Sequence, residues 1–187
     1  MKSHRKIASS FDVRPLREKL QSNLDLFDRH PFRRYGDSPH TGMTDIWVRY
    51  NDFAPYLKRG DFSTINDKHT SVWYPVAKEI NEVFPLISNL MQLVSGIELG
   101  GVLITKIPPG GKIERHTDDG WHALYYDKYY IPVSNKQGAI FGFEDGIIVP
   151  EEGDVWWFNN QTPHWVENNS NEDRIALIVC IRTKESL

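Results

Sequence analysis

The first half of the chain spaces its apolar residues as helices do. Residues 14–27 and 75–94 repeat apolar side chains every three or four positions, which predicts two amphipathic helical stretches. Pro85 interrupts the second stretch, so it is either two short helices or one kinked helix. Residues 28–44 are rich in Arg, Pro, Gly and Asp and predict a loop, and residues 46–50 alternate as on a half-buried strand.

From about residue 97 the pattern changes to short apolar segments separated by turn residues. These segments are residues 101–107, 129–133, 139–143, 147–149, 155–158 and 175–181. Many short strands with turn signals every eight to twelve residues are typical of a sandwich or jelly roll. We therefore expect a mainly β fold with N-terminal helices. It would be a single domain in which residues 1–95 form a helical and loop buttress for a β core at residues 96–187.

Composition narrows the class of function only slightly. With 187 residues the chain is long enough for one buried core, and its net charge of −3 argues against broad electrostatic contact with nucleic acid or an anionic membrane. Residues 1–34 are more basic than the rest, which fits either an acidic partner or a solvated helix surface. The single cysteine, Cys180, lies in an apolar run, and neither a secretory signal nor a membrane-length apolar run occurs, so a cytoplasmic protein is expected.

The segment Glu114-Arg115-His116-Thr117-Asp118 contains a His-x-Asp pair at a predicted strand end. Residues two apart on a strand project to the same side, so His116 and Asp118 can address one point. His164, just beyond the strand at 155–158, is the candidate for a third ligand. Two histidines and one carboxylate on one face of an octahedron leave three positions open for a cosubstrate and oxygen, as in non-haem iron oxygenases.

Arg174 follows His164 by ten residues and opens the last apolar strand. A guanidinium at the start of a buried strand needs an anion, and its planar fork suits a carboxylate. The alternative is a salt bridge to a neighbouring acid, Glu167, Glu172 or Asp173.

Several motif positions resemble the aspartyl/asparaginyl β-hydroxylases of the 2-oxoglutarate oxygenase superfamily, over about residues 100–182. They are Pro109-Gly110 ahead of His116, and then Gly153, Phe158, His164, Val166, Asn168 and Arg174 before the apolar run at 175–179. The resemblance implies a cupin-like double-stranded β-helix. It further implies Fe(II) held by His116, Asp118 and His164, with 2-oxoglutarate and O2 as cosubstrates. Arg174 would hold the distal carboxylate of 2-oxoglutarate, and Thr105 would contact it as well.

The chain departs from this family after the first histidine. Where relatives carry an Arg-x-His pair, this chain has Lys128-Tyr129-Tyr130, so we expect Lys128 and Tyr130 at the cosubstrate. An aromatic insertion at 119–127 precedes them and could form a lid. Its candidate substrate-pocket residues are Trp121, His122 and Tyr125, although these rings could equally pack on the roll.

The expected activity is hydroxylation of a C–H bond with release of succinate and carbon dioxide. The resemblance suggests an aspartyl or asparaginyl residue of a peptide or protein as the substrate, and a free amino acid is the alternative. The rivals are a cupin-like metal-dependent isomerase or hydrolase and a non-catalytic binding module on the same roll. Arg174 discriminates among them, because neither rival requires a cation ten residues past the last ligand.

Overall fold

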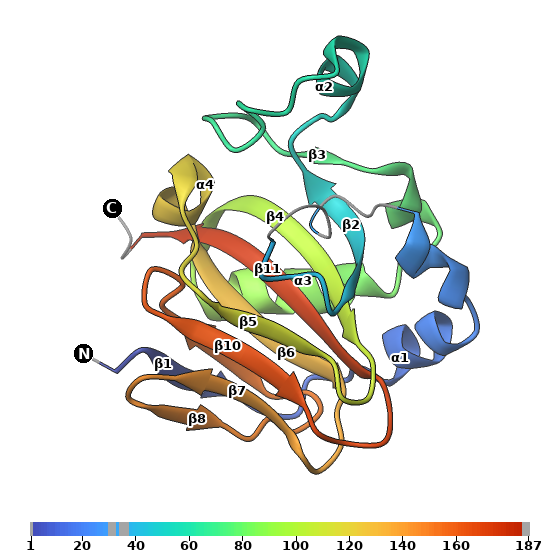
Figure 1. The fold of residues 1–187 in the computed structure, drawn as a ribbon, viewed down its shortest axis with the longest axis vertical. Helices are drawn as coiled ribbons and strands as arrows, with labels where there is room; N and C mark the ends of the chain where they lie inside the picture. Colours follow the sequence, from blue (N-terminus) through green and yellow to red (C-terminus); the bar gives the residue numbers. More distant parts are fainter. Residues whose placement is uncertain (1, 30–32, 34–37, 185–187) are drawn as a thin grey trace.

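Two antiparallel β-sheets form the body of the protein (Figure 1). The computed structural model describes residues 2–29, 33 and 38–184. Among these, the larger sheet has the strand order β1-β9-β6-β11-β4-β2-β3. Its strands are β1 (His4–Ala8), β2 (Thr44–Tyr50), β3 (Val72–Trp73), β4 (Gly96–Ile107), β6 (Asp127–Ser134), β9 (Val155–Phe158) and β11 (Arg174–Thr183). The smaller sheet, in the order β5-β10-β7-β8, contains β5 (Lys112–His116), β7 (Ala139–Phe143), β8 (Gly146–Ile148) and β10 (His164–Asn168).

An apolar core joins the two sheets. Ile113, Phe141 and Val166 of the smaller sheet pack in one buried cluster with Ile107 and Tyr130 of the larger one. Two sheets that bury their inner faces against each other are the expected arrangement of a jelly roll. All six strands predicted from the second half of the sequence are present.

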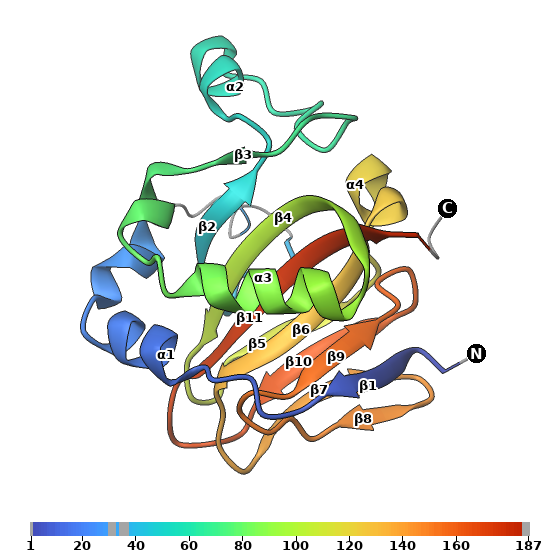
Figure 2. The ribbon, with the colours of Figure 1, turned by 180° about the vertical axis from the view of Figure 1, so that it is seen from behind.

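Helical segments cover the outer face of the larger sheet. They are α1 (Arg14–Gln21), the 3-10 turns η1 (Leu24–Asp28) and η2 (Pro75–Lys78), and α3 (Val83–Leu93). Figure 2 shows α3 lying across that face, and its Val83 and Leu90 are fully buried there. Residues 75–94 therefore form two separate helices, with Pro85 in the first turn of α3, where its missing N–H costs no intrahelical bond.

The first 95 residues also contribute strands to the larger sheet. β1 pairs with β9, β2 pairs with β4, and β3 pairs with β2 at the edge. The sequence predicted β2 but neither of the others, because β1 is largely polar and β3 has only two residues. The buttress and the roll thus share one sheet.

Two segments extend beyond the layers and approach the same end of the roll. The arm, residues 51–71 between β2 and β3, carries α2 (Ala54–Arg59) and stands away from the sheets in Figure 1. The predicted lid at 119–127 contains a short helix, α4 (Gly120–Tyr125). In the part of the chain that the structure describes, no helix is long and apolar enough to cross a membrane.

Candidate active site

The pairing of β5 with β10 brings the three predicted metal ligands together. His116 ends β5, Asp118 follows two residues later, and His164 begins β10 directly opposite His116. One potential ligand atom from each side chain lies within 4.8 Å of the others. His116 Nε2 is 3.6 Å from Asp118 Oδ1, and His164 Nε2 is 3.9 Å from Asp118 Oδ2. We call these three residues the triad.

Backbone carbonyls fix the orientation of both imidazole rings. His116 Nδ1 lies 2.6 Å from the carbonyl oxygen of Glu114, and His164 Nδ1 lies 2.8 Å from that of Thr162. A ring that donates from Nδ1 keeps the Nε2 lone pair available for a metal, and such second partners are typical of metal-binding histidines. The triad therefore fits a divalent transition metal.

The charges of the site favour the protonation states that bind a metal. Burial alone would raise the pKa of Asp118, but Lys128, His116 and His164 together hold that pKa well below its usual value. Burial lowers the pKa of His164 to about 4, against the opposing effect of Asp118. Lys128 forms an ion pair with Asp118. At neutral pH Asp118 is thus ionised and His164 is neutral, as metal ligation requires.

Arg174 lies in a small inner pocket beside the triad. This inner pocket is lined by the triad together with Thr105, Lys128, Tyr130 and Arg174, among others. Arg174 is 2% exposed, its Nη2 donates to Tyr130 Oη over 2.8 Å, and its Nε has no hydrogen-bond partner. The geometry brings all four residues that were expected near the cosubstrate into one pocket.

Arg174 makes none of the salt bridges that were its alternative explanation. Two of the candidate acids pair with lysines instead: Asp173 Oδ2 lies 3.8 Å from Lys106 Nζ, and Glu172 Oε2 lies 3.8 Å from Lys136 Nζ. Among the described residues, no carboxylate is within ion-pair distance of Arg174. A buried guanidinium without an anion is costly, so it suits an anionic ligand that enters from outside.

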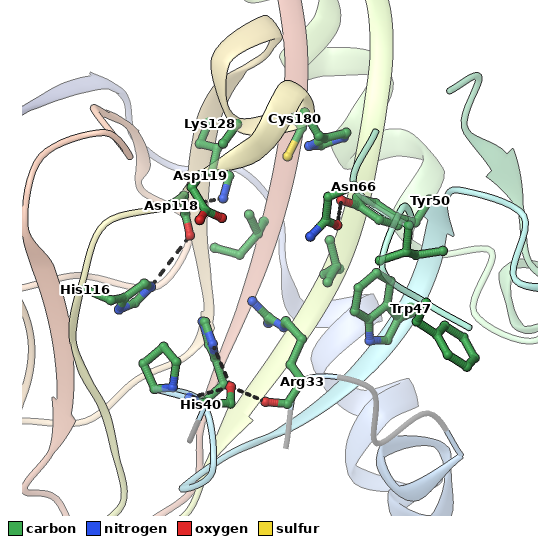
Figure 3. Close-up of a pocket in the computed structure, with 18 of the residues that line it drawn as sticks. Arg33, His40, Trp47, Tyr50, Asn66, His116, Asp118, Asp119, Lys128 and Cys180 are labelled. Carbon is green, nitrogen blue, oxygen red and sulfur yellow. Dashed lines mark hydrogen bonds and ion pairs between the residues drawn. The ribbon is translucent and has the colours of Figure 1, made fainter. Parts of the chain in front are cut away.

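A larger outer cleft, about 940 Å³ in volume, opens next to the triad. Figure 3 shows His116, Asp118 and Lys128 on one side of the cleft, and Trp47 and Tyr50 on the other. The N-terminal half supplies that second side, and Arg33 and His40 add to the lining. No local motif marks these residues in the sequence, and the pairing of β2 with β4 is what brings Trp47 and Tyr50 toward the triad.

The aromatic insertion reaches the outer cleft through one of its predicted residues. His122 lines the cleft, whereas Trp121 and Tyr125 are not among its lining residues, so a role of these two rings at the substrate stays a prediction. Residues four apart share a face of α4, and the Trp121 and Tyr125 rings stack 4.8 Å apart on it. His122 Nε2 instead accepts a hydrogen bond from the backbone N–H of Gly101 over 3.1 Å.

Three solved structures with the same fold are those of hydroxylases. A prolyl hydroxylase from Trichoplax adhaerens, in complex with a peptide fragment of the hypoxia inducible factor oxygen degradation domain, superposes with a TM-score of 0.61 at 12% identity, covering 98% of this chain and 85% of that one. A Pseudomonas putida prolyl-4-hydroxylase superposes with a TM-score of 0.55 at 12% identity, covering 97% of this chain and 93% of that one. A viral collagen prolyl hydroxylase from Paramecium Bursaria Chlorella virus-1, in a 2OG complex, superposes with a TM-score of 0.51 at 11% identity. The superposition covers 97% of this chain and 96% of that one. These likenesses confirm the double-stranded β-helix.

The sequence itself matches a known family. Comparison with curated protein sequences finds no significant match. However, residues 60–184, more than half of the 187, match the aspartyl/asparaginyl beta-hydroxylase family. The match begins at residue 60 and not near residue 100, so it includes part of the arm together with η2 and α3 behind the larger sheet. The fold and this match confirm the expected kind of enzyme, an iron- and 2-oxoglutarate-dependent hydroxylase, and the chain belongs to the aspartyl/asparaginyl beta-hydroxylase family.

Proposed function

We propose that this chain hydroxylates a C–H bond of an amino-acid unit, with Fe(II) held by His116, Asp118 and His164 and with 2-oxoglutarate as cosubstrate. The observation that carries the proposal is the joint placement of the triad and the anion-free Arg174 in one inner pocket. Iron with 2-oxoglutarate and O2 supplies the oxidising chemistry, and succinate and carbon dioxide are released.

The residues of the inner pocket bind and orient the cosubstrate. Arg174 pairs with the distal carboxylate of 2-oxoglutarate through charge-assisted hydrogen bonds. Thr105 and Tyr130 line the same pocket and offer hydroxyl groups to that carboxylate. Lys128 lines both the pocket and the cleft and holds one oxygen of Asp118, so it orients that ligand and contributes positive charge where the two spaces meet.

The outer cleft receives the substrate. It opens on the triad, so a molecule bound in it presents its C–H bonds beside the metal ligands. The candidates are an aspartyl or asparaginyl residue of a polypeptide and a small amino-acid derivative. The Trichoplax enzyme holds a peptide fragment, which supports the first candidate as compatible with this fold.

Arg174 argues against the rival activities on the same roll. A metal-dependent isomerase or hydrolase needs the triad but not a buried cation beside it, and a binding module needs neither. Arg174 is 2% exposed and its Nε has no hydrogen-bond partner. Burying such a guanidinium destabilises the fold unless an anion binds it.

Formation of succinate tests the proposal. The full chain, loaded anaerobically with Fe(II), is exposed to O2 and 2-oxoglutarate, with and without a cell extract as a source of substrate. We expect succinate in the wild type, a gain of one oxygen atom in a component of the extract, and loss of both in His164→Ala. Val149→Ser, an exposed residue outside both pockets, is the matched control. Succinate formation at the wild-type rate by His164→Ala would refute the assignment.

A further inference from the structure

The outer cleft has a charged end and an apolar end. Figure 3 shows Arg33 between the side that carries His116 and Asp118 and the side that carries Trp47. On the second side the lining continues with apolar residues of the arm, Phe53, Leu57, Phe62 and Ile65. The inference drawn from this division rests on the proposed function, because it concerns the substrate of the same site.

Arg33 is held in a fixed orientation at the charged end. Its Nε and Nη2 donate to Asp45 over 2.8 and 2.7 Å, and Asp45 is buried at the start of β2. This bidentate pair uses two of the three guanidinium nitrogens. The third, Nη1, makes no hydrogen bond with the residues that the structure describes. A guanidinium preorganised in this way can bind a carboxylate that enters the cleft without first ordering its own side chain.

Two hydrogen bonds join polar groups of the arm and of the end of β2, and apolar side chains of the arm line the cleft. Tyr50 Oη donates to Asn66 Oδ1 over 3.0 Å, and Asn51 Nδ2 donates to the carbonyl oxygen of Ile65 over 2.7 Å. At the rim Leu57 is 61% exposed and Phe62 is 37% exposed. Exposed apolar residues that line a cleft gain free energy when a ligand covers them.

This wall disfavours a polypeptide as its occupant. A peptide carries an N–H and a C=O at every residue, and each loses hydration against the apolar wall unless it finds a partner. A free amino acid is also a poor match for about 940 Å³, because pockets of about 300–1,000 Å³ hold drug-sized ligands. A molecule with an apolar body and at most one amide group fits both the size and the lining.

We propose that the substrate is a small carboxylic acid with an apolar body, an amino acid carrying an acyl or aryl group. Its carboxylate pairs with Arg33, and its apolar body lies against Trp47, Phe53 and Phe62. Leu57 covers the outer end of that body. The two ends of the cleft thus position the molecule next to the triad.

Binding of a matched series of probes to the full chain tests this proposal. The probes are N-octanoylglycine, N-octanoylglycinamide and glycine, and calorimetry measures their dissociation constants without turnover. Each titration is repeated with excess 2-oxoglutarate, so that binding of the acid to Arg174 is separated from binding in the outer cleft. We expect N-octanoylglycine to bind at least about tenfold more tightly than the amide and than glycine.

Three variants assign the two ends. Leu57→Ser should weaken the binding of N-octanoylglycine about five- to tenfold, because the apolar body loses an apolar contact. Val149→Ser removes a side chain of similar exposure that does not line the cleft, and it should leave the affinity for N-octanoylglycine unchanged. Arg33→Lys keeps a cation beside Asp45, so the fold survives, but the preference for the acid over the amide should fall about tenfold because an ammonium lacks the fork.

Equal binding of acid and amide, or wild-type binding by Leu57→Ser, would overturn the proposal. The proposal would also be overturned if a capped acidic tripeptide bound more tightly than N-octanoylglycine and if Leu57→Ser left the affinity for the tripeptide unchanged. That result would identify a peptide substrate. A chain that forms succinate but ignores the probes refutes only this inference. A chain that binds the probes as expected but forms no succinate refutes only the proposed function.

Discussion

Arg174 and Tyr130 share a hydrogen bond of 2.8 Å in which the guanidinium donates to the phenol oxygen. Burial raises the pKa of Tyr130, and the opposing effect of Arg174 does not cancel the rise. Tyr130 is therefore a neutral phenol at neutral pH and cannot act as the counter-anion of Arg174. Since no carboxylate in the described part of the chain pairs with Arg174, its buried positive charge suits an anion that enters the inner pocket.

Arg174→Ala should weaken 2-oxoglutarate binding by roughly a hundredfold to ten-thousandfold, because two charge-assisted hydrogen bonds are lost at about 1.5–3 kcal/mol each. Iron binding should survive, since Arg174 is not a ligand. Arg174→Lys should restore only part of the affinity. Anaerobic titration of the iron-loaded variants, followed by the absorption of the chelate, measures both quantities. Unchanged affinity in Arg174→Ala would remove the cosubstrate role.

His116→Ala and His164→Ala should each abolish stoichiometric iron binding, because two remaining ligands hold a labile divalent ion poorly. Asp118→Ala should weaken binding and remove activity. His40→Ala is the matched control: its ring lies 4.8 Å from that of His116, yet it is outside the triad. Metal analysis after gel filtration measures retention. Iron retained by His164→Ala, or lost from His40→Ala, contradicts the assignment.

His122 should make the protein acid-sensitive. Burial lowers its pKa to about 3 from the ordinary 6.5. Above pH 6.5 the histidine is neutral in both states and contributes nothing. As the pH falls from 6.5 toward 3, His122 becomes protonated in the unfolded chain but stays neutral in the folded chain, so the free energy of unfolding decreases. At pH 5 this loss is on the order of 2 kcal/mol.

Urea unfolding of wild type and His122→Phe at pH 7.5 and pH 5 checks this prediction. The variant loses the acceptor of the Gly101 N–H and starts from lower stability at pH 7.5. Its further decline at pH 5 should nevertheless be smaller than that of the wild type. An equal decline in both proteins would show that other groups carry the acid sensitivity.

Trp121→Ala should reduce stability and leave the Michaelis constant for the substrate nearly unchanged. The ring stacks on Tyr125 and contacts His69, and neither Trp121 nor Tyr125 is among the residues that line the cleft. Losing such aromatic contacts costs about 1–2 kcal/mol. Thermal unfolding and steady-state kinetics of Trp121→Ala and Tyr125→Ala separate the two effects. A raised Michaelis constant without lost stability would place these rings at the substrate.

The triad could be predicted from sequence because its spacing has a direct structural meaning. His116 and Asp118 are two residues apart at a strand end, and the period of a strand places them on one side. His164 required the pairing of β10 with β5, which the sequence does not state but which the family spacing implied. The position of Arg174 beside the triad could also be predicted, from the family spacing and from its place at the start of β11.

The cleft could not be predicted in the same way. Trp47 lies on the predicted strand at 46–50, but its role depends on pairing between β2 and β4, which are separated by the arm and α3. Arg33 lies in a segment that predicts only a loop. The insertion at 119–127 was recognised, yet its helical form decides which rings face the cleft, and six residues are too few to show a period.

The N-terminal half should prove indispensable for folding. Without residues 1–95, β4 loses β2 as a neighbour, β9 loses β1, and the outer face of the larger sheet loses α1 and α3. Exposed apolar faces and unpaired strand edges favour aggregation. A fragment of residues 96–187 should therefore be insoluble or molten, as judged by near-ultraviolet circular dichroism and gel filtration.

Leu20→Ala tests the same packing in the full chain. Leu20 is completely buried in α1, and truncating a buried leucine to alanine costs about 2–5 kcal/mol. Leu24→Ala is the matched control, because Leu24 is 52% exposed and should cost little. Both variants lie outside the two pockets, so each folded protein should keep the wild-type affinity for iron and 2-oxoglutarate. A fully folded and active 96–187 fragment, or a neutral Leu20→Ala, would show that the helices are dispensable and that the β core folds alone.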